Sequence, residues 1–351
     1  MSEHKRQRRR PGTRLVVGVA LVALLMMAVP ALAQDGIGRF GGADRFDTAV
    51  LGSQSEWGDD STNTVVLASA FSYPDALSAS ALCGELRAPL LLTSWGSVPD
   101  DVMDEIARVT PFDAATGRVV LIGGTAVIGP PVVTQLEDAG FEVSRIAGDD
   151  RYETSLAIAE QLLAAQDEAW TGEVWLARGD LFPDGISVSP YAYQIARPVL
   201  LTPGDAIPSG IAAFMEDNVN WAGIVGGPAA ISADVVAQRN AMGIDGPRIS
   251  GDDRYETSVA LAEYALGAGG IPASAEYIGI ASGEDFPDAL TGGIVTGQAD
   301  GVLLLSRQAS APQSTLDFAA AHTDPDEAWV FGGHRAVSED ARAQIEGVLY
   351  P

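Results

Sequence analysis

The chain has 351 residues, of which 47% are hydrophobic and 19% charged, a composition that indicates folded globular domains and argues against a disordered protein. Its 47 acidic residues outnumber its 21 Lys and Arg residues, which gives a formal net charge of −26 at pH 7. A surface this negative repels DNA, RNA and anionic membranes, so a nucleic-acid partner is disfavoured.

The first 33 residues have the pattern of a secretory signal. Six Lys and Arg residues come before an almost wholly apolar stretch at 15–29, and Ala31-Leu32-Ala33 then offers the small residues that a signal peptidase accepts. We expect cleavage after Ala33, which would leave 15 basic and 46 acidic residues and a net charge near −31. The alternative is an uncleaved membrane anchor, because the apolar stretch is close to the length that spans a bilayer.

One octapeptide, Gly-Asp-Asp-Arg-Tyr-Glu-Thr-Ser, occurs at 148–155 and again at 251–258. A divergent copy, Gly-Ala-Asp-Arg-Phe-Asp-Thr-Ala, stands at 42–49. This repetition predicts three units of about one hundred residues, each large enough to bury a core of its own. The arginines of the three copies are Arg45, Arg151 and Arg254.

Two acids in each copy stand three positions apart. This is the spacing of a capping box, in which the first acid caps a helix and the second returns a hydrogen bond to the backbone. The acids are Asp44 with Asp47, Asp150 with Glu153, and Asp253 with Glu256. The arginine between them allows two interpretations: contacts with neighbouring carboxylates or carbonyls that stabilise the fold, or two hydrogen bonds to an anionic ligand.

After the octapeptide, each unit passes through the same elements in the same order. A first apolar strand is predicted at 64–68, 173–177 and 277–281. An aromatic-Pro-Asp motif follows and starts a helix of small residues, such as 76–86. A second buried strand is predicted at 89–93, 198–202 and 301–306, with a helix such as 100–109 after it. A third strand ends in Gly-Gly at 119–124, 223–227 and 329–333, before a short helix such as 130–139. Extended pieces at 141–146 and 247–249 lead into the next unit.

Continuous apolar strands that alternate with helices predict parallel sheets covered on both faces, with right-handed crossovers. The predicted fold class is therefore α/β, with three or four parallel strands in each small unit. No linker rich in Pro, Gly or Ser separates the units, so we expect them to pack together in a closed, pseudo-threefold arrangement. The predicted boundaries are 1–33 for the signal and 38–143, 144–246 and 247–349 for the units.

The aspartates of the aromatic-Pro-Asp motif are candidate ligand-binding residues. Each follows a parallel strand and so lies at the carboxyl edge of a sheet, where open α/β sheets bind ligands. The alternative is that the preceding Pro fixes each Asp as a helix N-cap. The residues are Asp75, Asp184 and Asp288. The Gly-Gly pairs are interpreted as tight strand-to-helix turns, because no complete nucleotide-binding pattern surrounds them.

The sequence offers little for catalysis. Cys83, the only cysteine, lies in a small-residue helix without a neighbouring base and is interpreted as a core residue. After the signal, His322 and His334 are the only histidines, and neither has partners at the spacing of a catalytic triad or a zinc site. No carboxylate pair stands out for glycoside hydrolysis. We predict a non-catalytic protein without a cofactor, and leave loosely bound divalent cations open.

The order of the three motifs resembles a known family. Arg-Ile-Ala-Gly-Asp-Asp-Arg-Tyr-Glu-Thr-Ser, with Phe-Pro-Asp-Ala and Val-x-x-Ile-Gly-Gly downstream, is similar to the cell wall binding type 2 repeat of Gram-positive bacteria. The resemblance covers nearly all of 38–349. Phe46 and Asp47 replace Tyr and Glu in unit one, and Gly185 replaces Ala in unit two, so we expect the units to differ in ligand affinity.

The resemblance implies three Rossmann-like or Toprim-like modules that bind an anionic secondary polymer, or a peptidoglycan-associated glycan, without a covalent bond. It implies that the protein lies at the cell wall or cell surface after secretion. A contact with the membrane is expected only if the signal is not cleaved. Such modules are commonly joined to a catalytic or adhesive domain, for which residues 34–37 and 350–351 leave no room. The alternatives are a wall hydrolase, either an amidase or a glycosidase, and a structural protein of a surface layer. Wall contacts are expected at Arg45, Arg151, Arg254, Asp75, Asp184 and Asp288.

Overall fold

The computed structural model describes residues 36–111 and 117–351. The predicted secretory signal at 1–33 lies outside these residues, so its cleavage stays a prediction. In the part of the chain that is described, no helix combines the length and apolar character needed to cross a membrane.

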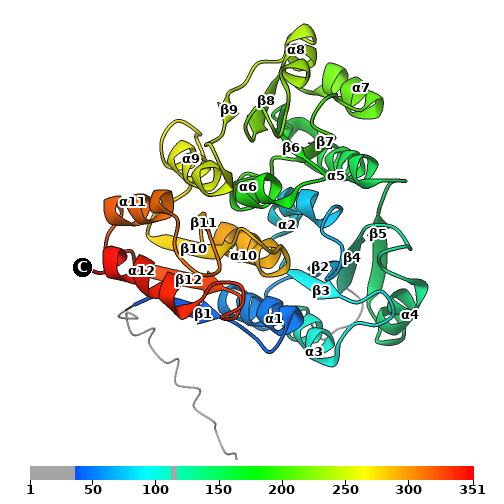
Figure 1. Ribbon diagram of the computed structural model, residues 1–351. Helices are drawn as coiled ribbons and strands as arrows, with labels where there is room; N and C mark the ends of the chain where they lie inside the picture. Colours follow the sequence, from blue (N-terminus) through cyan, green and yellow to red (C-terminus); the bar gives the residue numbers. More distant parts are fainter. Residues whose placement is uncertain (1–35, 112–116) are drawn as a thin grey trace, which may run out of the picture. The chain divides into compact units, whose positions relative to one another are not determined.

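The described strands form three sheets of four strands, and every pairing is parallel, which confirms the α/β prediction (Figure 1). The first sheet has the order β3-β2-β4-β5, with β2 Thr64–Ser69, β3 Leu90–Thr93, β4 Arg118–Ile122 and β5 Glu142–Ile146. The second has the order β7-β6-β8-β9, with β6 Glu173–Arg178, β7 Val199–Thr202, β8 Trp221–Val225 and β9 Arg248–Ile249. The third has the order β1-β12-β10-β11, with β1 Gly38–Phe40, β10 Tyr277–Ser282, β11 Val302–Ser306 and β12 Glu327–Phe331.

The edge strand of each sheet runs directly into the octapeptide of the next unit. The predicted extended pieces at 141–146 and 247–249 are β5 and β9, which complete the first and second sheets. The third sheet is completed by β1, from the opposite end of the chain, which pairs with β12 so that Gly38 lies beside Trp329. Strand β1 was not predicted, since three residues are too few to show a strand pattern. Its pairing closes the three units into a ring.

Four helices recur in each unit, in the order that the sequence predicts. The octapeptide helices are α1 Arg45–Glu56, α5 Arg151–Gln166 and α9 Arg254–Leu266. The helices after the aromatic-Pro-Asp motif are α2 Ser80–Leu86, α6 Phe182–Gln194 and α10 Pro287–Gln298. Those after the second strand are α3 Asp100–Val109, α7 Ser209–Asn218 and α11 Gln313–Ala321, and those after Gly-Gly are α4 Pro130–Asp138, α8 Ala233–Ala241 and α12 Glu339–Leu349. A short 3₁₀ turn, Asp167–Ala169, follows α5.

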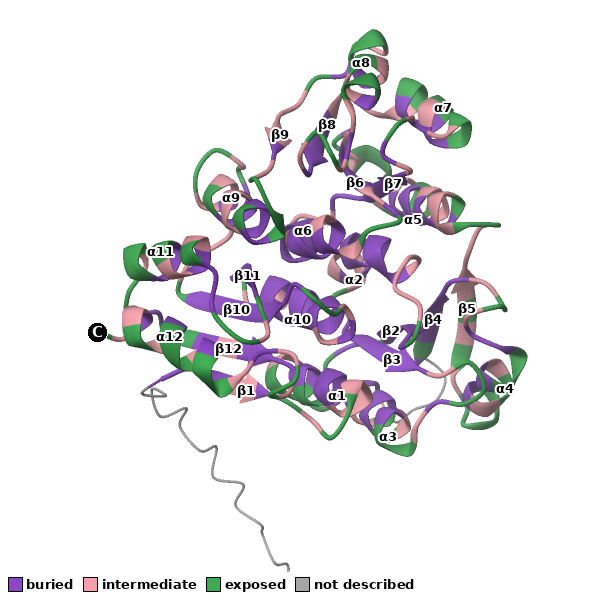
Figure 2. Cartoon of the chain, viewed as in Figure 1, coloured by how far each residue is buried: buried purple, intermediate pink, exposed green. Residues whose placement is uncertain are grey.

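One helix from each unit packs against its equivalents, namely α2, α6 and α10. The helices α6 and α10 are almost wholly buried, as Figure 2 shows, and α2 is buried over residues 80–83. Small residues permit the close approach: a Cβ on Gly84 would lie 2.0 Å from the carbonyl oxygen of Tyr193, and one on Gly293 would lie 1.8 Å from Ser189 Oγ. The small-residue composition of these helices therefore reflects mutual packing of the units, as a pseudo-threefold arrangement requires.

The helix predicted at 76–86 is not continuous. The structure has a 3₁₀ turn at Ala76–Ser78, then α2 at Ser80–Leu86. The backbone N–H of Ala79 donates to the carbonyl of Ala76, three residues back, so the first turn is tighter than an α-helix. Within α2, Cys83 is fully buried, as the sequence predicts, and burial raises the pKa of its thiol.

Candidate functional site

The octapeptide fixes the start of a helix. In α5, Asp150 Oδ1 accepts the N–H groups of Tyr152 at 2.8 Å and Glu153 at 2.9 Å, which satisfies two of the free donors of the first turn. Glu153 Oε2 in turn accepts the N–H of Asp149 at 2.9 Å, one residue before the cap. The equivalent acids make the same bonds in α1 and α9, with Asp44, Asp47, Asp253 and Glu256.

The first glycine of the octapeptide is required by the same turn. A Cβ on Gly148 would lie 2.2 Å from Glu153 Cβ, closer than two carbon atoms can approach. The N–H of Gly148 donates to Thr154 Oγ1 at 3.1 Å. Gly42 and Gly251 are held in the same way by Thr48 and Thr257.

Each octapeptide arginine holds the loop that follows the first strand of its own unit. Nη1 donates to the carbonyl of Ala70 at 2.6 Å for Arg45, of Gly179 at 2.9 Å for Arg151, and of Gly283 at 2.5 Å for Arg254. These carbonyls lie at the carboxyl edges of β2, β6 and β10. All three arginines therefore make the same structural hydrogen bond. Each guanidinium has further N–H donors, which this bond leaves free.

The three aromatic-Pro-Asp loops converge. The rings of Tyr73, Phe182 and Phe286 contact one another, with centroid separations of 5.8, 5.3 and 6.3 Å. The Tyr73 hydroxyl also donates to the carbonyl of Asp180 in unit two, at 2.8 Å. The aromatic position of this motif is therefore a contact between units, which explains why all three copies keep a ring there.

The three candidate aspartates face the octapeptide of the next unit, and we call each such contact a seam. Asp75 lies beside Thr154 and Arg151, Asp184 beside Arg254, and Asp288 beside Thr48 and Arg45. The last pair closes the cycle from unit three back to unit one. The structure therefore places the six predicted residues in three pairs, each consisting of an aspartate and the octapeptide arginine of the next unit.

The alternative interpretation of these aspartates as N-caps is wrong for Asp184 and Asp288, which lie inside the first turns of α6 and α10. Asp75 stands at the N-cap position of the 3₁₀ turn, but its side chain makes no capping hydrogen bond. In α6 and α10 the Pro of the first turn places the Asp one residue later, with its carboxylate at the seam.

The seam carboxylates are partly withdrawn from water. Burial raises the pKa of Asp184 to about 6, against the lowering effect of Arg254 and Arg178. Burial also raises the pKa of Asp288 to about 6, and Thr48 and Arg45 oppose this shift. For Asp75 burial raises the pKa, while Thr154 and Arg151 lower it. The octapeptide of the next unit thus favours the charged form of each carboxylate, through a threonine and an arginine at Asp75 and Asp288 and through an arginine at Asp184.

The first glycine of each Gly-Gly pair makes room for these carboxylates. Gly123, Gly226 and Gly332 have φ of +107°, +112° and +102°, a region that other residues rarely adopt. A Cβ on them would lie 2.7, 2.4 and 2.4 Å from Oδ2 of Asp75, Asp184 and Asp288. The Gly-Gly pair is therefore a turn, as predicted, and also one wall of the seam.

Sequence reasoning missed a second set of arginines, six positions before the first. Arg39, Arg145 and Arg248 donate Nη1 to the carbonyls of Gly332, Gly123 and Gly226, at 2.8, 2.5 and 2.5 Å. They join each edge strand to the Gly-Gly turn of the preceding unit. The signal was present, because an Arg followed by Phe or Ile precedes every octapeptide, but it lies outside the eight residues that define the repeat.

The seam between units three and one opens into a cleft of about 570 Å³. Three arginines and a histidine line it, Arg39, Arg45, Arg335 and His334, together with the acids Asp44, Asp285 and Asp288. Arg39 is paired with Glu339 at 2.9 Å, whereas no ion pair of Arg335 is found among the described residues. In a chain of net charge −26, this cleft collects as many arginines as acids.

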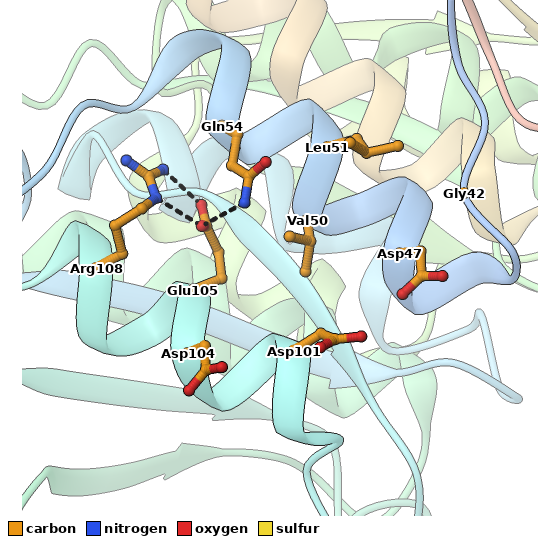
Figure 3. Close-up of a pocket in the computed structure, with 9 residues that line it drawn as sticks. All are labelled: Gly42, Asp47, Val50, Leu51, Gln54, Asp101, Asp104, Glu105 and Arg108. Atoms are coloured by element: carbon orange, nitrogen blue, oxygen red, sulfur yellow. Dashed lines mark hydrogen bonds and ion pairs between the residues drawn. The ribbon is translucent and has the colours of Figure 1, made fainter. Parts of the chain in front are cut away.

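A different groove, between α1 and α3, is strongly acidic (Figure 3). Its single cation, Arg108, is held by Glu105 at 2.7 Å and Asp59 at 2.9 Å, while Asp47, Asp101 and Asp104 also line the groove. An anionic ligand would be repelled here. Among the described residues, no three His, Cys, Asp or Glu side chains are placed to hold a metal ion.

A comparison with known protein families finds the same three repeated units. The family described as "Cell wall binding domain 2" matches residues 39–133, 145–236 and 248–342. Two solved structures from Clostridium difficile, Cwp6 and Cwp8, superpose with a TM-score of 0.77 each at 22% identity. They cover 90% and 89% of this chain, and the matched parts are 49% and 51% of those chains. At this identity the likeness establishes the fold alone.

Two curated relatives come from Bacillus subtilis (strain 168). N-acetylmuramoyl-L-alanine amidase LytC is 28% identical over 293 residues, which is 83% of this chain and 54% of the relative. The amidase enhancer is 29% identical over 274 residues, 78% of this chain and 35% of the relative. The matched region thus spans about a third to a half of these longer proteins.

Proposed function

The chain belongs to the cell wall binding domain 2 family, and we propose that it holds to an anionic polymer of the wall through its seams, without a covalent bond. Family membership supports cell wall binding as the general role. We further propose that the protein is secreted and that residues of the seams contact the polymer.

The observation that carries the proposal is the cleft between units three and one. A protein of net charge −26 repels an anionic polymer at long range, so binding requires local cations in a partly enclosed site. Arg45 and Arg335 supply them, in addition to Arg39, which is paired with Glu339, and guanidinium groups match phosphate and carboxylate geometry. The acidic groove between α1 and α3 has no available cation of this kind.

The proposal assigns no catalytic step to this chain. The amidase activity named for LytC belongs to that protein, of which the match covers 54%. A zymogram of the purified protein on Gram-positive walls tests this part, and we expect no cleared band. A cleared band would favour the hydrolase alternative.

The binding proposal is tested by co-sedimentation with purified Gram-positive walls, intact or stripped of their secondary polymers. We expect the protein to pellet with intact walls, to remain in solution with stripped walls, and to be released by salt because exposed charge contacts are screened. Equal pelleting with both wall preparations would exclude the secondary polymer as the ligand. A chelator arm shows whether divalent cations bridge the contact.

A further inference from the structure

Trp95 is one of four large hydrophobic residues that are exposed in the described part of the chain. It lies two residues beyond the end of β3, at the same carboxyl edge of the first sheet as Asp75. Its side chain is 53% exposed, whereas the other five tryptophans are buried or half-buried. An exposed indole needs a reason, because burying a side chain of this size stabilises a protein.

The equivalent positions in the other units show that the fold does not require a ring here. The carbonyl of Trp95 accepts the N–H of Gly129 at 2.8 Å. The same backbone bond joins Ser232 to Gly204 at 2.7 Å and Ser338 to Gln308 at 2.9 Å. A glycine and a glutamine therefore serve the structure as well as a tryptophan.

The indole is nevertheless held in one orientation. Its only polar atom, Nε1, donates to the carbonyl of Thr125 at 3.0 Å. The ring also lies against Gly129, since a Cβ there would come 2.7 Å from Cε2 and 2.9 Å from Cζ2. Gly129 is the N-cap of α4, where α8 and α12 have Ser232 and Ser338. Unit one thus has a glycine where its repeats have a serine, and that glycine is what lets the ring pack there.

The two segments that flank the ring, 94–99 and 123–135, contain no ionisable residue in a chain with 47 acids. The charged groups placed nearby are Asp75, beside Gly123, and Arg145, which donates to the carbonyls of Gly123 and Ile128. Both segments mix polar residues, such as Ser94, Ser97 and Thr125, with exposed apolar ones such as Ala126 and Pro130, whereas a protein partner would favour a continuous apolar surface. A sugar ring fits both features, because its C–H face carries partial positive charge and the aromatic face is negative, while its hydroxyls need polar neighbours.

We propose that Trp95, supported by Gly129, is a stacking platform for a neutral sugar ring of a wall glycan. This inference rests on the proposed wall-binding function and adds a subsite to it. Charge contacts in the seam cleft and ring stacking at Trp95 act on different parts of the ligand, so an acidic protein retains a wall glycan whose sugars are uncharged at this subsite.

The test uses the polysaccharide released from purified Gram-positive walls, titrated into the full chain with acrylamide quenching of tryptophan fluorescence. Trp95, as the most exposed tryptophan, dominates the quenching, and we expect the glycan to shield it. Trp95→Ala should lose this shielding and bind the glycan about tenfold more weakly, with an unchanged melting transition. Gly129→Ser, which restores the residue found in the other units, should weaken binding similarly because its side chain displaces the ring.

Leu51→Ala is the control, since Leu51 is an exposed apolar side chain in the acidic groove between α1 and α3 and should leave glycan binding unchanged. Wild-type affinity in both Trp95→Ala and Gly129→Ser would overturn the platform while leaving the wall-binding proposal intact. Failure of the wild-type chain to bind either walls or the released glycan would overturn both.

Discussion

Single residues in this protein act across distances that the sequence does not reveal. Gly332 is the clearest example, because its backbone adopts a φ of +102° and its missing side chain leaves room for Asp288. Asp288 in turn faces Arg45, more than 240 positions earlier in the chain. From the sequence, a repeated Gly-Gly pair predicts only a local turn. In the structure its first glycine is also part of a contact between units.

We expect Gly332→Ala to lower the free energy of unfolding by about 1–3 kcal/mol, because the new Cβ meets both a strained φ and the Asp288 carboxylate. Urea denaturation measures the change. Gly333→Ala is the matched control, since nothing lies within 4 Å of its added Cβ. Equal effects of the two substitutions would show that the seam carboxylate does not constrain Gly332.

The three octapeptide helices, α1, α5 and α9, share the same N-terminal capping but end in different surroundings. The octapeptide helices begin alike, but α1 ends at Glu56, in a hollow that it shares with Tyr277 and Glu327 of unit three. Burial, and then the negative charge of Glu327, raise the pKa of Glu56 to about 7. The contact between α1 and unit three therefore favours a protonated Glu56.

This shift makes the stability of the contact between α1 and unit three dependent on pH. A carboxyl whose pKa is raised from 4.5 to about 7 on folding contributes its full stability below pH 4.5 and loses that contribution as the pH rises through 7. We expect Glu56→Gln to raise the melting temperature at pH 8 relative to the wild type and to leave it nearly unchanged at pH 4. Glu276→Gln, an exposed acid in the same hollow, is the control. A gain of equal size at both pH values would contradict the assignment.

The elements themselves could largely be predicted from the sequence. Apolar runs identified each first, second and third strand, and capping residues located α1, α5 and α9, because these signals are local. The strand β1 and the division of the helix at 76–86 could not be predicted, since both depend on packing against other units. The six candidate ligand residues were predicted individually. Their pairing across the seams depends on how one unit packs against the next, and the sequence of a single unit does not show this.

At the scale of the whole molecule, the N-terminal strand completes a sheet whose other strands come from unit three. Phe40 stacks on Trp329 with centroids 4.2 Å apart, Arg39 donates to Gly332, and the N–H of Gly332 donates back to Phe40 at 2.7 Å. Units one and three are therefore joined by backbone pairing as well as by side chains.

Phe40→Ala should destabilise the protein by about 3–5 kcal/mol, the cost of truncating a buried Phe. Its effect should extend to the other end of the chain: hydrogen exchange should accelerate in β12, around Val330, as well as in β1. Phe71→Ala, at an exposed position, is the control for removing a ring. Faster exchange confined to residues 36–44 would show that β1 is not needed to close the ring.

If the cleft between units three and one binds the wall polymer, the side chain of Arg335 should contribute directly to the affinity for walls. Arg335 is exposed and lines the cleft, whereas Arg118 is exposed at the amino end of β4, away from the carboxyl edges that form the seams. The measurement is the affinity of the wild type, Arg335→Gln and Arg118→Gln for intact Gram-positive walls in co-sedimentation at fixed salt. We predict that Arg335→Gln binds about tenfold more weakly, a loss of about 1.4 kcal/mol, and that Arg118→Gln binds as the wild type does. Equal affinity of all three proteins would contradict the claim.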